Sequence, residues 1–121
     1  MEYNNNFEYD LKVGEMYERE LGNILEGKRI EVKTDFLAFK TGNVFIEYES
    51  RGKPSGIAKT EAEWYAVIIL DEDKMINNII LIPTERLKEI ARRKLFTKWD
   101  VLGGDNNTSK GILIKISELV D

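Results

Sequence analysis

The chain of 121 residues contains no cysteine and no histidine. The absence of cysteine excludes disulfides, thiolate zinc sites and cysteine nucleophiles, and the absence of histidine excludes imidazole bases and imidazole metal ligands. Any bound metal is therefore expected to be a hard cation held by oxygen. An enzyme built from this chain would have to use carboxylates, lysine, hydroxyls or a metal-bound water.

Long apolar runs are also missing from the sequence. No window has the length of a membrane span or the pattern of a signal peptide, so the expected location is the cytoplasm and no membrane partner is expected. The length predicts a single domain over residues 1–121. The formal net charge of −4 argues against nonspecific coating of nucleic acid, although segregated charge would still allow a basic face.

Regular periodicity in several segments predicts an α+β fold with a central mixed sheet flanked by helices. After a loose first ten residues, apolar positions at helical spacing predict a helix from about Leu11 to Gly27. A capping box predicts a short helix starting at Thr60. The other expected elements are strands over 29–35, 42–50, 64–70, 79–82 and 112–116 and a helix over 85–93, with 64–70 and 79–82 buried on both faces.

The first two strands concentrate charge. The turn at residues 40–43 predicts that they form an antiparallel hairpin, and alternate side chains of a strand share a face. Because carboxylates that face one another across a sheet are destabilising, such a cluster is either solvated or holds a cation. The residues gathered on the polar face are Glu31, Lys33, Asp35, Glu47 and Glu49.

Two groups of cations border these segments. The loop after the hairpin carries Arg51, Lys53, Ser55 and, slightly later, Lys59, which would offer charges and a hydroxyl to a phosphate. A second group would complete a positive rim for a phosphate backbone, with scattered solubility charges as the open alternative. It comprises Arg92, Arg93, Lys94 and Lys98 and precedes a Gly- and Asn-rich loop at 103–111 that is either a turn or a binding loop.

The chain resembles the PD-(D/E)XK nuclease superfamily, in particular its small phage-encoded members. The resemblance lies in the order of the expected elements and in the amino-acid sequence of residues 30–35, 41–47, 52–57 and 60–64. The resemblance covers residues 12 to 70. It implies a restriction-endonuclease-like αβββαβ core, a Mg²⁺ or Mn²⁺ cofactor and, for a phage-encoded chain, a location in the host cytoplasm.

Two alignments with the superfamily motif remain open. In the first, Glu31-Val32-Lys33 is the E-x-K motif, which implies Glu31 as a metal ligand. Lys33 would then orient the attacking water or help to deprotonate it. In this alignment no acid precedes Glu31 on a plausible strand.

The second alignment takes Asp35 as the first acid and Glu47 and Glu49 as the second motif, with Glu49 where lysine is usual. Lys33 would replace the missing cation. This alignment also implies a place beside the metal for Glu20, on the first helix. The order of elements favours it.

The leading hypothesis is therefore a Mg²⁺-dependent endonuclease that hydrolyses DNA phosphodiester bonds and acts as a homodimer. The resemblance implies Asp35, Glu47 and Glu31 as its metal ligands, with Glu20 and Glu49 as supporting groups. The alternative is a non-catalytic module, such as a phage accessory or inhibitor protein, that binds nucleic acid or a protein on a nuclease-like fold. A third reading is a solvated sheet face in which Lys33 pairs with the glutamates.

Overall fold

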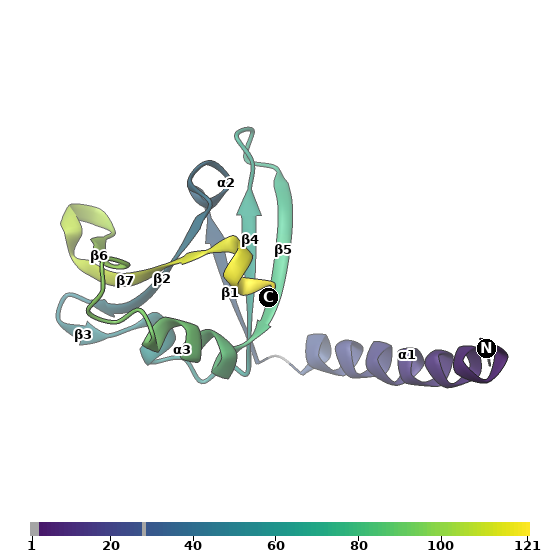
Figure 1. Cartoon of the computed structure of the whole chain (residues 1–121). Helices are drawn as coiled ribbons and strands as arrows, with labels where there is room; N and C mark the ends of the chain where they lie inside the picture. Colours follow the sequence, from purple (N-terminus) through teal and green to yellow (C-terminus); the bar gives the residue numbers. More distant parts are fainter. Residues whose placement is uncertain (1–2, 28) are drawn as a thin grey trace. The chain divides into compact units, whose positions relative to one another are not determined.

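The structure, a computed structural model, describes the backbone of residues 3–27 and 29–121 and the side chains of residues 7–27, 29–104 and 106–121. The chain divides into two compact units, residues 1–30 and 31–121. The N-terminal helix, expected as part of a single domain, makes up nearly all of the first unit (Figure 1).

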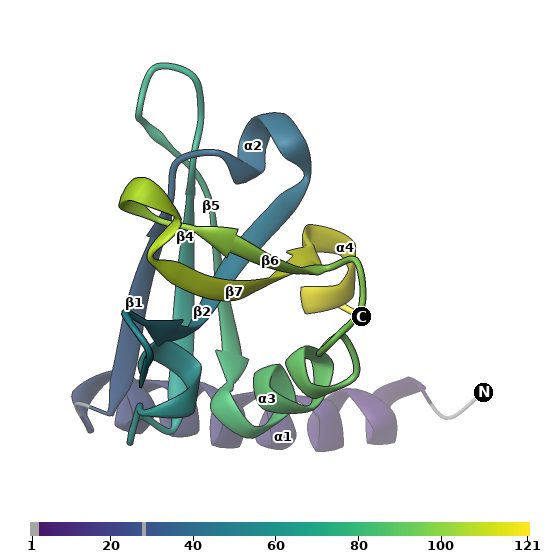
Figure 2. The ribbon, with the colours of Figure 1, turned by 90° about the vertical axis from the view of Figure 1, so that its left-hand side faces the viewer.

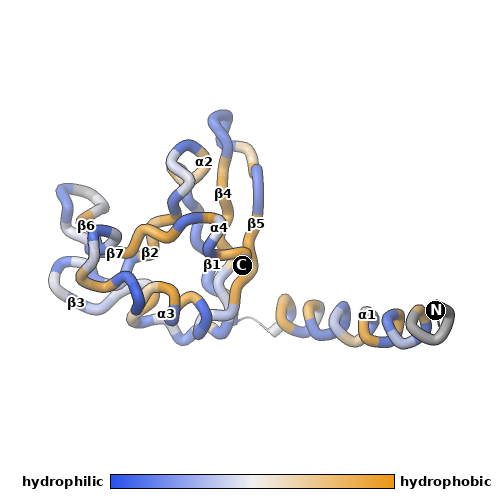
Figure 3. Tube along the Cα trace, viewed as in Figure 1, coloured by the Kyte–Doolittle hydropathy of each residue, from blue (hydrophilic) through white to orange (hydrophobic). Residues whose placement is uncertain are grey.

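The helix of the first unit is α1 (Tyr3–Glu26). It ends at Gly27 as predicted, where the Gly27 N–H donates to the carbonyl of Asn23 at 2.8 Å. The sequence predicts a loose start over the first ten residues, which is wrong for residues 3–10 because they are helical. Residues 1–2 lie outside the described chain. Apolar and polar positions alternate along α1 (Figure 3). Its exposed large apolar side chains are Phe7, Tyr9, Leu11, Met16, Tyr17, Leu21 and Leu25.

The second unit contains a three-stranded sheet in the order β1-β4-β5, formed by β1 (Ile30–Asp35), β4 (Trp64–Leu70) and β5 (Ile76–Pro83). In Figure 1, β1 and β4 run in the same direction. β4 and β5 are antiparallel, with Trp64 opposite Pro83 and Ile68 opposite Ile79. The sheet is therefore mixed, as predicted.

A four-stranded antiparallel sheet completes this unit in the order β3-β2-β7-β6. Its strands are β2 (Asn43–Ser50), β3 (Lys53–Pro54), β6 (Asp100–Gly103) and β7 (Ser109–Lys115). Figures 1 and 2 show β6 and β7 running across the direction of β4 and β5. Two crossed sheets thus replace the single central sheet that the sequence predicts.

The predicted hairpin between residues 29–35 and 42–50 is wrong. β1 pairs with β4, whereas β2 pairs with β3 and β7. The connection is not a tight turn but the short helix α2 (Ala38–Thr41), which ends at Gly42 with φ at 78°. In its observed place β2 faces the apolar strand β7, with Val44 opposite Ile114, and avoids the repulsion between acids that direct pairing with β1 would create.

The core of this unit lies where both sheets meet α3 (Thr84–Arg92). α3 contacts β4, β5 and β7, and Leu87, Ile90 and Ala91 are buried on it as predicted. The largest fully buried side chains come from four strands and α3: Val44 and Ile46, Val67 and Ile69, Ile82, Ile112 and Ile114, and Leu87. Burial of aliphatic side chains of this size stabilises the fold by about 1.5–3 kcal/mol each. The α+β class predicted from the sequence is therefore confirmed, with a different strand order.

Three local predictions also need correction. Residues 60–63 are not helical, because the Thr60 hydroxyl accepts the N–H of Ala62 at 3.1 Å in a turn, after the 3₁₀ helix η1 (Gly56–Ala58). Neither β4 nor β5 is buried on both faces: along β4 buried residues alternate with half-buried ones, and Ile79 of β5 is exposed. The 103–111 loop is shorter than expected, since β6 ends at Gly103, β7 begins at Ser109 and the 3₁₀ helix η2 (Asp105–Asn107) lies between them.

Candidate nucleic-acid interface

The structure distributes the predicted hairpin residues over two sheets. Glu31, Lys33 and Asp35 belong to β1, whereas Glu47 and Glu49 belong to β2. Two of them have partners outside the predicted cluster. Glu31 Oε1 accepts the hydroxyl of Thr60 at 3.2 Å, and Glu49 Oε2 lies 3.5 Å from Lys110 Nζ. Within the described part of the chain Lys33 forms no ion pair with these acids, and the predicted five-residue cluster does not form on one hairpin face.

Asp35 has a structural role. Its carboxylate is 6% exposed, and Oδ1 accepts the backbone N–H groups of Leu37 at 2.9 Å and Ala38 at 2.8 Å. Oδ2 accepts the N–H of Phe45 at 3.1 Å. The first bonds satisfy N–H groups at the start of α2, which have no partner within the helix. The last one ties the end of β1 to β2, so most of the acceptor capacity of Asp35 is used by the backbone.

The predicted metal site receives no geometric support. Glu20 is an exposed residue of α1 and belongs to the N-terminal unit, whereas the other predicted ligands belong to the second unit. Within the described residues, no three Asp or Glu side chains are grouped closely enough to hold a metal ion. The Mg²⁺ or Mn²⁺ cofactor therefore stays a prediction from the sequence.

The predicted phosphate loop is a tight turn. Arg51 and Gly52 have φ angles of 50° and 80°, and the Arg51 N–H donates to the Thr108 carbonyl at 2.8 Å. Lys53 and Lys59 are exposed. Ser55 Oγ is buried and finds no hydrogen-bond partner among the described residues, so it is not presented to a phosphate.

Cations instead gather around Trp99, in the segment between α3 and β6. The ammonium groups of Lys94, Lys98 and Lys115 lie 5.0, 5.1 and 5.5 Å from the centroid of the indole ring. At these distances each ammonium group is attracted by the negative face of the ring. Two parts of the chain contribute to the group, because Lys94 and Lys98 lie in the segment between α3 and β6 whereas Lys115 ends β7.

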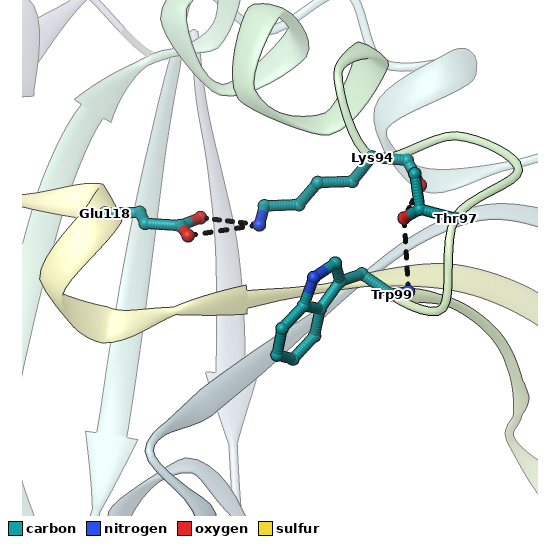
Figure 4. Close-up of polar contacts among 4 residues, drawn as sticks. All are labelled: Lys94, Thr97, Trp99 and Glu118. Carbon is teal, nitrogen blue, oxygen red and sulfur yellow. Dashed lines mark hydrogen bonds and ion pairs between the residues drawn. The ribbon is translucent and has the colours of Figure 1, made fainter.

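Local hydrogen bonds hold the loop that carries these side chains. The Thr97 hydroxyl donates to the Lys94 carbonyl at 2.6 Å and accepts the N–H of Trp99 at 3.2 Å (Figure 4). The Trp99 carbonyl accepts the N–H of Leu113 at 2.9 Å, which joins the loop to β7. Hydrogen bonds to the N–H and to the carbonyl of Trp99 thus fix the backbone that carries the indole.

Asp100 anchors the same loop to β2. Its Oδ2 accepts the N–H of Phe96, which has a φ of 61°, at 2.9 Å, and its Oδ1 accepts the hydroxyl of Tyr48 at 2.7 Å. Burial, followed by the hydrogen bond to Asp100, raises the pKa of Tyr48 to about 12. The phenol therefore remains a neutral donor at physiological pH, and the loop keeps its anchor.

One of the three lysines around Trp99, Lys94, also forms an ion pair with Glu118. Glu118, on α4 (Ile116–Leu119), lies with Oε2 at 3.0 Å from Lys94 Nζ, and Oε1 accepts a hydrogen bond from the same nitrogen at 3.1 Å (Figure 4). Both side chains are partly covered, with exposed fractions of 14% for Lys94 and 33% for Glu118.

These residues line a cavity of about 550 Å³. Four cations and two acidic residues border it, so the cavity is basic although the chain is acidic. We refer to it as the Trp99 pocket. Its lining consists of Arg86, Ile90, Arg93, Lys94, Thr97, Lys98, Trp99, Glu118 and Asp121.

The sequence indicated part of this pocket. Arg93, Lys94 and Lys98 were predicted as a positive rim and do line it, whereas Arg92 lines a different, largely apolar cavity of about 280 Å³. The contributions of Trp99 and Glu118 were missed. The one local signal was the Lys98-Trp99 pair, in which a cation precedes an aromatic residue.

No family model matches the chain, and comparisons with curated proteins and with solved structures find no match either. Within the described part of the chain, no helix combines the length and the apolar character needed to cross a membrane.

Proposed function

We propose that this protein binds nucleic acid and that the Trp99 pocket is its binding site. The observation that carries the proposal is the presence of three ammonium groups within 5.5 Å of one indole ring, at the wall of a basic cavity. Cations neutralise phosphates, and aromatic rings stack on bases. Their combination in one groove is the usual design of sites for single strands.

The overall acidity of the chain does not oppose this proposal, because its charge is unevenly distributed. Residues 1–30 contain seven acidic and four basic residues, whereas residues 31–121 contain fifteen acidic and fourteen basic residues. The excess of acid thus lies mostly outside the second unit. Within that unit, Arg93 and Lys98 give the pocket a local excess of positive charge.

The size of the pocket favours single strands. A cavity of about 550 Å³ is of the size that encloses a small ligand, and a nucleotide that is flipped out or unpaired fits that description. A duplex presents no free base face to an indole. Single-stranded DNA or RNA is therefore the expected ligand, with phosphates on the lysines and a base on Trp99.

The test is a titration of a fluorescently labelled single-stranded oligonucleotide with the full chain, followed by anisotropy at several salt concentrations. Saturable binding that weakens with salt is expected, and neutralisation of the four cations of the pocket gives a slope of log K against log salt of roughly −3. No binding at low salt would overturn the proposal.

Metal-dependent hydrolysis of DNA is a second candidate function. It is favoured by the hydrogen bond that joins Asp35 to the Phe45 N–H, because Glu47 follows Phe45 by two residues on the same face of β2. Two of the acids implied by the resemblance are thus tied to the same strand. A third ligand would have to come from the substrate, water or a rearrangement.

This second candidate predicts that Mg²⁺ or Mn²⁺ stabilises the protein. At a metal concentration about 100 times the Kd, the free energy of unfolding should rise by about 2.7 kcal/mol, because the ion would bind only the folded chain. Thermal denaturation with metal or EDTA measures this change, alongside nicking of supercoiled plasmid. Glu47→Gln should lose both effects, and Glu72→Gln, an exposed residue of the β4–β5 turn, should keep them. Equal stability with metal and EDTA, without nicking, would rule this candidate out.

A further inference from the structure

Lys94 links the carboxylate of Glu118 to the indole of Trp99. Lys94 Nζ is 3.0 Å from Glu118 Oε2 and 5.0 Å from the centroid of the Trp99 ring, so a single ammonium group separates the carboxylate from the indole (Figure 4). A base stacked on Trp99 would occupy the place of that ammonium group. Its edge would then face Glu118.

Lys94 is the partner of both oxygens of this carboxylate. Oε1 accepts a hydrogen bond from Lys94 Nζ, and the buried Oε2 lies 3.0 Å from the same nitrogen. Buried acceptors are normally satisfied. When Lys94 moves to a phosphate, both oxygens therefore need new donors, which a ligand in the pocket can supply.

The chemistry of the bases selects one ligand. An ionised carboxylate only accepts hydrogen bonds, and its two oxygens match two parallel donors. On its Watson–Crick edge guanine has two adjacent donors, N1–H and the N2 amino group. Adenine, cytosine, thymine and uracil each place at least one acceptor beside their donor, which a carboxylate would repel.

Given the proposed function, on which this step rests, we infer that the Trp99 pocket takes an unpaired guanine and that Glu118 reads its Watson–Crick edge. The guanine stacks on the indole and donates N1–H and N2–H to the two oxygens of Glu118. Lys94 leaves the ring face and pairs with a phosphate of the same strand. The guanine must be unpaired because a duplex uses the same edge for cytosine.

The test compares single-stranded oligothymidylates that differ at one central position, which is dG, dA, dC, dT or deoxyinosine. Binding to the full chain is measured by anisotropy. A bidentate contact should favour dG roughly 10- to 100-fold over dA, dC and dT. Deoxyinosine lacks the N2 amino group and should fall between dG and the other bases.

Glu118→Gln tests the assigned residue. The amide keeps the shape of the side chain but has only one acceptor, so the preference for dG should vanish while the affinity for oligothymidylate is kept or increased, because a negative charge is removed. The matched control is Glu85→Gln on α3, where Glu85 pairs with Lys88 at 3.6 Å, and it should retain the preference.

The outcomes separate this inference from the proposed function. Equal binding of all five oligonucleotides by the wild-type chain, or a dG preference that survives Glu118→Gln, overturns the guanine assignment and leaves nucleic-acid binding standing. Failure to bind any of the oligonucleotides overturns both.

Discussion

The double substitution Arg93→Glu/Lys98→Glu should weaken binding of a single-stranded oligonucleotide on the order of 100-fold at low salt. Both side chains line the Trp99 pocket and both are exposed, so reversing their charge should leave the core intact. Each reversal removes one phosphate contact and adds a repulsion. The salt dependence should flatten as well, because fewer counterions are released on binding.

The matched control is Lys40→Glu/Lys74→Glu, which changes the net charge by the same amount. Lys40 lies on α2 and Lys74 in the β4–β5 turn, which are at the far end of the second unit from α3 (Figure 1). Affinity should fall only slightly in this variant. An equal loss in both variants would mean that net charge, and not the Trp99 pocket, governs binding.

Asp35→Ala should cost about 3 kcal/mol or more of the free energy of unfolding. The substitution leaves the buried N–H of Ala38 and the partly buried N–H groups of Leu37 and Phe45 without their acceptor. An unsatisfied buried donor costs about 1–3 kcal/mol. Asp35→Asn retains one acceptor oxygen and should lose less. Urea denaturation in the presence of EDTA measures both variants without any contribution from metal.

Glu31→Ala provides the comparison for Asp35. Glu31 lies on the same strand but is exposed, and its loss should change stability by no more than about 0.5 kcal/mol. If Asp35→Ala unfolds at the same urea concentration as the wild-type protein, its carboxylate is not the structural cap described above. It would then be available as the metal ligand that the sequence resemblance implies.

The elements with a strong apolar period were predictable from sequence. β4, β5 and α3 were found close to their predicted bounds. Val67 and Ile80 belong to short apolar runs typical of strands, and Leu87 belongs to an apolar stripe at helical spacing, and all three are buried. Strand pairing was not predictable in the same way. β1 and β2 follow each other in the chain, yet β2 buries Val44 and Ile46 against a strand more than sixty residues away.

The Trp99 pocket shows the same limit. The run from Arg93 to Lys98 was visible as a basic segment, but its aromatic and acidic members depend on long-range contacts. Lys115 reaches the indole because β7 pairs with β6, and Glu118 reaches Lys94 because α4 follows β7 directly. A local sequence pattern does not show which distant residues the fold brings next to one another. The mistaken hairpin had the same cause, since alternation identifies a strand but not its partner.

The most direct test of the central claim uses Trp99 as its own reporter. The chain has two tryptophans, so Trp64→Phe leaves Trp99 as the single source of indole fluorescence. Titration of this variant with a single-stranded oligonucleotide should change the emission in parallel with the anisotropy of the labelled strand, and Trp99→Phe should show no such change. Unchanged emission from Trp99 while the oligonucleotide binds would contradict the account, because the ligand would then lie elsewhere on the protein.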